Sequence, residues 1–376
     1  RAPPRNRVHR RHGRDGMTNK PKVNVLVLFG GQSGEHDVSL RSAQTVIGAL
    51  DSERYAVRQV GITREGGWIA SGDPMAALTA SSPLFQLGDG KAPVGEIHAE
   101  PGLPVLARDT VDVVFPVLHG PMGEDGTIQG MLELAGIPYV GSGVLGSAVA
   151  MDKAMAKLVL SQAGIPQAKW ALVNRSEWAT DQESVVASIV ADLGLPCFVK
   201  PANMGSSVGV SKAHDEAELR QAINFAHEYD RRVVIEEAID ARELEISVLG
   251  NDQPIASVAG EIVPCNEFYD YNAKYVDDDS ELIIPADLSP DKLAEMQEIA
   301  IRAFRALDLA GMARVDFFLE RDTERLLLNE VNTIPGFTSI SMYPMLWEAS
   351  GLPLPELVDR LIDLAVERHS HPRRVV

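Results

Sequence analysis

The apolar segment KVNVLVLFGG, residues 22–31, places the strongest constraint on the fold of this chain. A strand that is apolar at nearly every position is typical of parallel sheets, which are covered on both faces. The segment ends in a glycine turn, and residues 39–50 then follow with the apolar spacing of an amphipathic helix. Strand-like segments at 55–63, 111–118 and 137–142 continue this alternation. We therefore expect the chain to begin with a doubly wound, Rossmann-like α/β domain.

The pattern changes twice further along the chain. Residues 70–108 are rich in Gly and Pro and are expected to form a loose insertion. A helix over 151–164 leads into a mixed unit of strands and helices, and antiparallel strands and a long amphipathic helix follow. We predict a Rossmann-like domain at 21–141, a central α+β subdomain at 142–237 and a C-terminal α+β domain at 238–376.

Charged residues interrupt two strand-like segments, VDFFLE and RLLLNEVN, that the polar turn RDTE joins. If this hairpin is symmetric about Thr323, Asp316 lies opposite Glu330 and Arg314 lies opposite Asn332, all on one face. The other face would then carry Val315, Phe317, Leu319, Leu327 and Val331.

The chemistry of that charged face has two interpretations. Two carboxylates and an amide oxygen are ligands that Mg²⁺ accepts beside substrate phosphates, and an arginine stabilises a developing oxyanion. The alternative is a solvated hairpin face that holds ordinary cross-strand charge pairs.

Composition narrows the class of partner. The net charge is −18, although the first 20 residues carry seven Arg or Lys and one Asp, which leaves −24 for the remainder. So acidic a remainder is expected to avoid nucleic acid, and we expect residues 1–20 to be a disordered basic leader. Neither of the two cysteines has metal-ligand spacing around it, and no apolar run has the length of a membrane span. A cytoplasmic protein without membrane partners is the simplest expectation.

Two glycine-rich segments are candidates for anion binding. FGGQSGEHDVS follows the first strand, but its Glu35 suits a substrate ammonium better than a phosphate, and a solvated helix-start acid is an equal alternative. The segment is not GxGxxG, and no acid follows the second strand, so a nicotinamide dinucleotide is not expected. FVKPANMGSSVGVSK places Lys200 before a Gly/Ser loop that could close over phosphates or be a plain hairpin.

Three further residues stand in suggestive positions. Lys153 begins a helix, Lys274 lies in a polar loop, and His119 follows a strand of the first domain with Glu124 and Asp125 beyond it. Isolated lysines are usually solvated, and a lone histidine is more often structural than catalytic. A functional role for these three residues is therefore expected only if the other motifs of the chain support it.

Seven motifs together resemble the D-alanine:D-alanine ligase family of the ATP-grasp superfamily. The match runs in order from about residue 22 to 370, and its motifs read GGQSGEHDVS, LHGPMGEDGTIQG, MDK, VKPANMGSSVGVSK, FYDYNAKY, ARVDFF and NEVNTIPGFTSIS. The resemblance implies an N-terminal Rossmann-like, pre-ATP-grasp domain followed by a two-part ATP-grasp fold that clasps ATP.

The resemblance also implies roles for particular residues. Glu35 would bind the ammonium of the first D-alanine near His119, Ser341 would help hold the second, and Ser206 and Tyr275 would hydrogen-bond with Glu35. Arg314 and the Gly336 backbone would stabilise the oxyanion. Two Mg²⁺ ions, with Mn²⁺ and K⁺ as further candidate ions, would be bound by Asp316, Glu330 and Asn332. ATP would contact Lys153, Lys200, Ser207, Glu236, Glu237, Ile239, Glu243 and Lys274.

The function implied is ATP-dependent ligation of two D-alanines through D-alanyl phosphate, with release of ADP and phosphate, for peptidoglycan precursor synthesis by a homodimer. Tyr275 resembles the dipeptide-forming branch. One alternative is a D-alanine:D-lactate ligase. Another is a non-catalytic nucleotide-binding protein on the same fold, in which part of the catalytic set would be missing, whereas all of it is present here.

Overall fold

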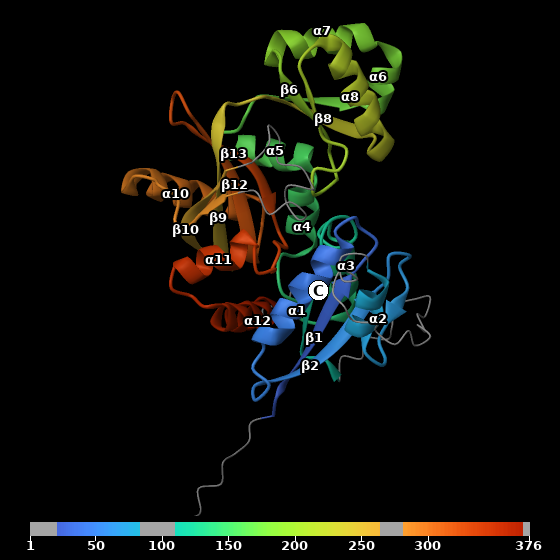
Figure 1. The fold of residues 1–376 in the computed structure, drawn as a ribbon, viewed down its shortest axis with the longest axis vertical. Helices are drawn as coiled ribbons and strands as arrows, with labels where there is room; N and C mark the ends of the chain where they lie inside the picture. Colours follow the sequence, from blue (N-terminus) through green and yellow to red (C-terminus); the bar gives the residue numbers. More distant parts are fainter. Residues whose placement is uncertain (1–20, 83–109, 264–280, 371–376) are drawn as a thin grey trace, which may run out of the picture.

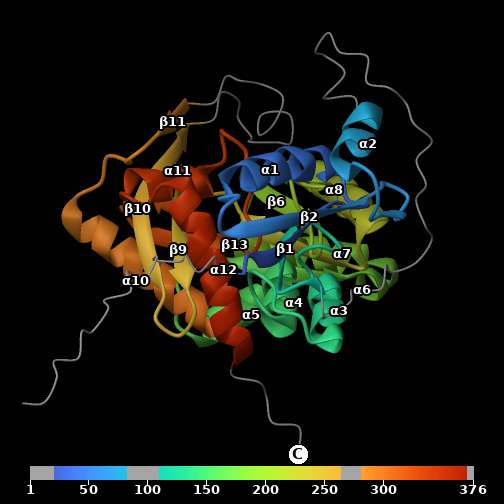
Figure 2. The ribbon, with the colours of Figure 1, turned by 90° about the horizontal axis from the view of Figure 1, so that it is seen from below.

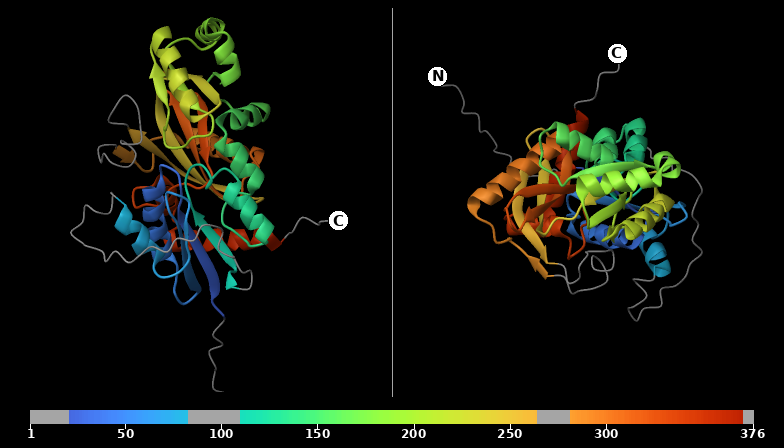
Figure 3. Two further views of the ribbon diagram at one scale, coloured as in Figure 1. Left: turned by 90° about the vertical axis from the view of Figure 1, so that its right-hand side faces the viewer. Right: turned by 90° about the horizontal axis from the view of Figure 1, so that it is seen from above.

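The computed structural model describes residues 21–82, 110–263 and 281–370, and these form three sheets (Figure 1). The central sheet and its helices lie at one end of the molecule and the N-terminal sheet at the other, with the C-terminal sheet between them (Figures 1 and 3). This is the predicted mixture of an α/β unit with two α+β units. The predicted leader 1–20 lies outside the described residues, and no helix in the described part is both long and apolar enough to cross a membrane.

The N-terminal sheet has the order β3-β2-β1-β4. Its strands are β1 (Val23–Gly30), β2 (Tyr55–Ile62), β3 (Trp68–Ile69) and β4 (Val113–Val117), and β1 pairs in parallel with both β2 and β4. Residues 25–30 of β1 are buried, which explains the nearly continuous apolar run. Helices α1 (His36–Ala49), α2 (Pro74–Ser81) and α3 (Thr127–Ala135) accompany the sheet.

Two local expectations for this domain need correction. The strand expected at 137–142 is reduced to a single parallel bridge between Val114 and Tyr139. The segment 70–108 is not uniformly loose, because α2 forms within it. Asp73 caps this helix by accepting a hydrogen bond from the Ala76 N–H at 3.0 Å, and Pro74 occupies its first turn, where a missing N–H costs nothing.

The central sheet is antiparallel, with the order β5-β8-β6-β7. Its strands are β5 (Trp170–Asn174), β6 (Cys197–Pro201), β7 (Ser211–Ala213) and β8 (Arg232–Glu237). Helices α6 (Arg175–Thr180), α7 (Gln182–Leu193) and α8 (Glu216–Tyr229) pack against the face that carries Val233 and Ile235. The opposite face carries Val234, which packs with Ala154. Helices α4 (Val144–Met151) and α5 (Lys153–Gln162) connect this unit to the N-terminal sheet.

The C-terminal sheet has the order β11-β10-β9-β12-β13 and is antiparallel throughout. Its strands are β9 (Ala241–Gly250), β10 (Ile255–Val263), β11 (Glu281–Ile283), β12 (Gly311–Glu320) and β13 (Leu326–Asn332). One face is apolar and packs on α10 (Pro290–Ala306) and α5. Helix α11 (Met342–Ala349) contacts β9 and β10.

The last helix, α12 (Leu354–Ser370), packs on both the C-terminal unit, in which sequence division placed it, and the N-terminal sheet. Its buried residues Leu357 and Leu361 join the hydrophobic core of the N-terminal sheet, and Asp359 accepts a hydrogen bond from the Tyr55 hydroxyl at 2.7 Å. Figure 2 shows α12 alongside both the β9 strand and the N-terminal sheet. The predicted boundaries at 141/142 and 237/238 fall before α4 and between β8 and β9, but this core crosses them. The domain division itself stays a prediction.

Candidate active site

The hairpin of β12 and β13 has the predicted register at its charged end. Asp316 pairs with Glu330, and Arg314 pairs with Asn332. Beyond Asp316 a bulge at Asn329 shifts the register, so that Phe317 pairs with Leu328 and not with Asn329. The two-residue alternation therefore breaks at this point.

The bulge corrects one detail of the predicted faces. Leu327 was expected on the apolar face with Val315, but it pairs with Phe318, whereas Leu326 and Leu328 join the apolar core. An extra residue cannot be recognised from apolar spacing alone, and here it reverses the faces of residues 326–328 relative to the charged end of the hairpin. Glu330 and Asn332 lie on the other side of the bulge and keep their predicted face.

Arg314 is the centre of an ion-pair network on this face. Its Nε and one terminal nitrogen donate to the two oxygens of Asp316, each at 2.8 Å, and its Nε lies 2.9 Å from a carboxylate oxygen of Glu245 on the neighbouring strand β9. Burial opposes the positive charge, but the carboxylates of Asp316 and Glu245 outweigh it and hold the pKa of Arg314 well above its ordinary value. Asp316 and Glu245 are buried, which rules out a merely solvated hairpin face.

The oxygen donors of this face fit a hard divalent cation. Glu330 and Asn332 line the pocket described below, and the Asn332 amide nitrogen donates to Asp316 at 3.0 Å, so the amide oxygen stays available. Arg314 and Asn332 together donate three hydrogen bonds to the Asp316 carboxylate, and a carboxylate offers about four acceptor positions. Two carboxylates and an amide oxygen, completed by substrate phosphates, match the preference of Mg²⁺. No group of three or more His, Cys, Asp or Glu side chains in the described residues is arranged as a complete metal cage.

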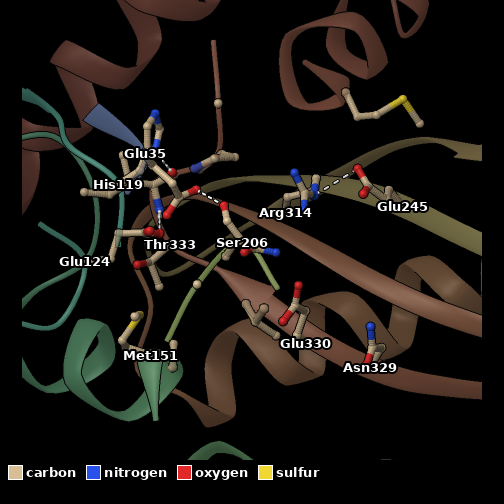
Figure 4. Close-up of a pocket in the computed structure, with 18 of the residues that line it drawn as sticks. Glu35, His119, Glu124, Met151, Ser206, Glu245, Arg314, Asn329, Glu330 and Thr333 are labelled. Atoms are coloured by element: carbon tan, nitrogen blue, oxygen red, sulfur yellow. Dashed lines mark hydrogen bonds and ion pairs between the residues drawn. The ribbon is translucent and has the colours of Figure 1, made fainter. Parts of the chain in front are cut away.

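One pocket brings together nine of the predicted site residues from all three units of the chain. Its lining includes Glu35, His119, Lys153, Ser206, Arg314, Glu330, Asn332, Gly336 and Ser341. In Figure 4, Glu35, His119, Glu124 and Ser206 gather on one side of this pocket, while Arg314 and Glu245 face it from the other. The segments that carry these residues are far apart in the sequence, so the pocket exists only in the folded chain.

Glu35 is the N-terminal flanking residue of α1, yet its side chain does not cap that helix. It instead accepts a hydrogen bond from the Ser206 hydroxyl, in the loop between β6 and β7. The predicted contact between these two residues is thereby confirmed. Ser206 has a left-handed backbone, with φ of 49°, and this turns the loop toward Glu35. A side chain at Gly205 would lie 3.0 Å from the Glu35 carboxylate, so only glycine fits this approach without displacing it.

His119 lies beside Glu35 in a buried position. Its Nδ1 is 3.0 Å from the carbonyl oxygen of Ile334, which can only accept, so Nδ1 carries the proton. Its Nε2 has no hydrogen-bond partner among the described residues. Burial lowers the pKa of His119 and favours the neutral imidazole, although the negative charge of Glu35 opposes this shift.

Glu124 is a third titratable group in this corner of the pocket. Its carboxylate accepts from the Gly120 N–H at 2.7 Å and from the Ile334 N–H at 3.2 Å. Burial, reinforced by the nearby Glu35 carboxylate, raises the pKa of Glu124 to about 8. Near neutral pH the Glu124 carboxyl is therefore mostly protonated.

Two lysines of the pocket, Lys153 and Lys157, lie on α5, and a third lysine, Lys200, lies on β6 of the central unit. Asp152 caps α5 by accepting from the Met155 N–H at 3.0 Å, which fixes the start of the helix at Lys153. The Lys153 ammonium donates to the Met204 carbonyl at 2.6 Å, and Lys200 donates to Glu236 at 2.7 Å. The second oxygen of Glu236 lies 3.0 Å from the ammonium of Lys157. The side chain of Glu236 thus holds two lysines.

The charges of this cluster affect one another. Burial alone would raise the pKa of Glu236, but Lys157 and Lys200 outweigh it and lower that pKa to about 2. For Lys200, burial lowers the pKa, while Glu236, Glu330 and Glu243 raise it, with a net upward shift. Lys200 therefore keeps its positive charge in the field of Glu236, Glu330 and Glu243.

The remaining predicted residues are placed as follows. Glu237 accepts from the Lys169 N–H at 2.7 Å, Ile239 follows it between β8 and β9, and Glu243 lies on β9 across from Phe318. Ser207 continues the left-handed backbone of the loop, with φ of 59°. The Ser341 hydroxyl accepts from the Thr338 N–H at 2.9 Å. Lys274 and Tyr275 lie outside the described residues, and their roles stay predictions.

Three charged residues of the site had no role assigned from sequence. The helix that carries Lys157 and the strand that carries Glu245 follow from the sequence. The sequence does not indicate, however, that these two charged side chains are buried. Glu124 was visible near His119, and its neighbouring glycines are a signal of a cleft-lining loop. Periodicity predicts the face of a strand and does not reveal which residue of another unit covers that face.

Comparison with known proteins places the chain among ligases. The family model described as D-ala D-ala ligase N-terminus matches residues 24–142, and the model described as D-ala D-ala ligase C-terminus matches residues 159–363. A D-alanine–D-alanine ligase of Thermoanaerobacter sp. is 51% identical over 372 residues, covering 94% of this chain and 99% of the relative.

Two solved structures share the fold. The D-alanine-D-alanine ligase from Coxiella burnetii aligns with a TM-score of 0.78 and 38% identity, covering 93% of this chain and 95% of the other. The VanG D-Ala:D-Ser ligase from Enterococcus faecalis aligns with a TM-score of 0.78 and 37% identity, covering 92% and 100%. The second relative differs from the first in the substrate that its name gives.

Proposed function

This chain belongs to the D-alanine–D-alanine ligase family, and from that membership we propose that its pocket joins two D-alanine molecules with the consumption of ATP. The observation that carries the proposal is a single pocket lined by a carboxylate from the first unit, a lysine and a serine loop from the middle of the chain, and the charged hairpin. Such a pocket offers an ammonium site, phosphate contacts and an oxyanion donor to one set of bound substrates.

In the first step, a carboxylate oxygen of one D-alanine attacks the γ-phosphorus of ATP, and the bond to ADP breaks. Glu35 holds the ammonium of this D-alanine, and Lys153 and Lys200 bind the phosphates. Transfer of this kind depends mainly on alignment and on neutralising charge, which these fixed groups provide. The product is D-alanyl phosphate.

In the second step, the free amine of the second D-alanine attacks the acyl carbon. The tetrahedral oxyanion forms beside Arg314 and the Gly336 N–H, and its collapse breaks the bond between the acyl carbon and the phosphate oxygen. The proton that the amine loses leaves with the inorganic phosphate, and the dipeptide remains. Ser341 is proposed to orient the second D-alanine. Loop 203–209 must shield the acyl phosphate from water, and its contact with Glu35 supports this role.

We assign Mg²⁺ to the oxygens of Asp316, Glu330 and Asn332. When bound there, the metal would neutralise phosphate charge as a Lewis acid. Lys200, which lies in the field of Glu330, is positioned to share the same phosphates. Mn²⁺ would suit the same oxygen ligands.

Three compounds are candidates for the second substrate: D-alanine, D-serine and D-lactate. The likeness to a D-Ala:D-Ser ligase favours testing D-serine, and D-lactate is the second rival. The direct experiment measures phosphate release with Mg²⁺-ATP and D-alanine alone, and then with D-serine or D-lactate added, with the products separated by chromatography. We expect release with D-alanine alone and D-alanyl-D-alanine as the main product. No release that depends on D-alanine would refute the function.

Assembly and location belong to the same proposal. We propose a homodimer that acts in the cytoplasm, where ATP is supplied, and that feeds peptidoglycan precursor synthesis. Exposed apolar side chains on the neighbouring helices α3 and α4 support association, with Leu134 93% and Leu145 58% exposed. Light scattering should give twice the chain mass of 40.7 kDa.

A further inference from the structure

Lys157 is a buried cation that the reaction described above does not use. It lies one turn after Lys153 on α5, and only 3% of its side chain is exposed. Lysine is rarely buried so completely unless an opposite charge accompanies it. The carboxylate of Glu236, 3.0 Å away, supplies that charge.

The contact between Lys157 and Glu236 is electrostatic, without a well-aligned hydrogen bond. The Lys157 ammonium, which lines the pocket, lies 3.0 Å from Glu236 but at an angle that is poor for a hydrogen bond. Lys200, in contrast, donates a hydrogen bond of 2.7 Å to the same carboxylate. Two ammonium groups therefore share one buried carboxylate.

This sharing matters because Glu236 and the ATP phosphates compete for the ammonium of Lys200. If Lys200 turns from Glu236 to the ATP phosphates, the carboxylate of Glu236, which is 3% exposed, loses its hydrogen-bonded partner. An unpaired buried carboxylate is strongly unfavourable, so Glu236 alone would resist the movement of Lys200. Lys157 remains beside Glu236 and keeps its charge balanced.

We propose that Lys157 is a positioning residue: its charge holds Glu236 and so frees Lys200 to bind the nucleotide. This inference rests on the proposed ligase function, since it concerns the same ATP site. It predicts that the effect of Lys157 on ATP binding passes through Glu236 and not through direct contact with ATP. A role in packing alone would change stability and leave ATP affinity unchanged.

The first experiment compares Lys157→Met with the wild type by calorimetric titration with a non-hydrolysable ATP analogue and Mg²⁺. We expect the Kd to rise about tenfold, because Glu236 now retains Lys200, while kcat at saturating ATP falls much less. Lys157→Arg keeps the charge and should bind the analogue nearly as the wild type does. Lys22→Met removes an equal charge from an exposed position and serves as the control.

The second experiment tests the coupling. In a Glu236→Gln background there is no carboxylate to retain Lys200, so adding Lys157→Met should leave the Kd unchanged. A further rise in Kd in the double variant, or a wild-type Kd in Lys157→Met, would overturn the proposal. The double variant also serves if Lys157→Met fails to fold, because it removes one charge of each sign.

The two proposals can fail separately. If the wild type releases no phosphate with D-alanine, the ligase function fails. If the wild type is active and binds the analogue but the two substitutions act additively, only the role of Lys157 fails.

Discussion

Ser206 donates a hydrogen bond to the carboxylate of Glu35, a residue 171 positions earlier in the chain. The contact joins the loop after β6 to the start of α1 and so closes one wall of the pocket. It leaves the other Glu35 oxygen beside Gly120 and Gly205. The substrate ammonium would therefore meet a carboxylate that is already oriented by the loop that covers it.

Ser206→Ala should weaken binding of the first D-alanine. A hydrogen bond to a charged group contributes about 1.5–3 kcal/mol, so kcat/KM for D-alanine should fall roughly 10- to 100-fold. Steady-state kinetics at saturating ATP measure this, and an unchanged melting temperature separates it from misfolding. Ser176→Ala, at an exposed position of α6, is the matched control. Normal kcat/KM in Ser206→Ala would contradict the role of the contact.

Glu330→Gln should lower kcat by orders of magnitude while leaving the fold intact, because it removes an anionic metal ligand from the hairpin. The measurement is phosphate release across a range of Mg²⁺ concentrations, with circular dichroism to monitor folding. Glu298→Gln, exposed on α10, removes the same charge away from the pocket and should keep wild-type activity. Near-normal turnover in Glu330→Gln would refute the assignment of the metal.

Arg314→Met should destabilise the protein as well as inactivate it. Asp316 and Glu245 would both stay buried after losing their shared cation, and breaking such a pair costs about 3–5 kcal/mol. Urea unfolding measures the loss. Adding Glu245→Gln should restore part of the stability, because it removes one of the two unpaired buried charges. Arg325→Met is the control and should change stability little, because the Arg325 side chain is 58% exposed. No recovery in the double variant would argue against the network.

Glu124 should make stability depend on pH. Burial raises its pKa from 4.5 to about 8 in the folded protein, so the folded state holds a proton that the unfolded state releases. This stabilising contribution is complete below pH 4.5 and is lost as the pH rises toward 8. Glu124→Gln cannot ionise, so its melting temperature should gain on that of the wild type between pH 5 and 8. A constant difference across this range would contradict the shift.

The sequence predicts most of the elements and one wall of the site. The continuous run at β1 indicates a buried parallel strand, and the register of Arg314 and Asp316 with Asn332 and Glu330 follows from hairpin symmetry. The fold of the middle and C-terminal units follows from strand and helix periodicity together with the family resemblance. These features are local, and local patterns carry them.

Contacts between residues far apart in the chain do not follow from local sequence patterns. The Asn329 bulge moves Leu327 off the apolar face, and α12 joins the core of a sheet more than 200 residues earlier, as the hydrogen bond from Tyr55 to Asp359 illustrates. The burial of Lys157 and Glu245 depends in the same way on which strand or helix covers them. Apolar periodicity describes a single segment and does not show which distant elements pack against it. The burial of these residues can therefore be recognised only in the folded chain.

The most direct test of the account follows the oxygen atoms of D-alanine. D-alanine labelled with ¹⁸O in both carboxylate oxygens is incubated with Mg²⁺-ATP and the enzyme, and the phosphate released is analysed by mass spectrometry. If the carboxylate attacks ATP and the amine then displaces phosphate, each phosphate carries one ¹⁸O and the new peptide carbonyl keeps the other. Phosphate without ¹⁸O, or no phosphate that depends on D-alanine, would contradict the proposed ligation through D-alanyl phosphate.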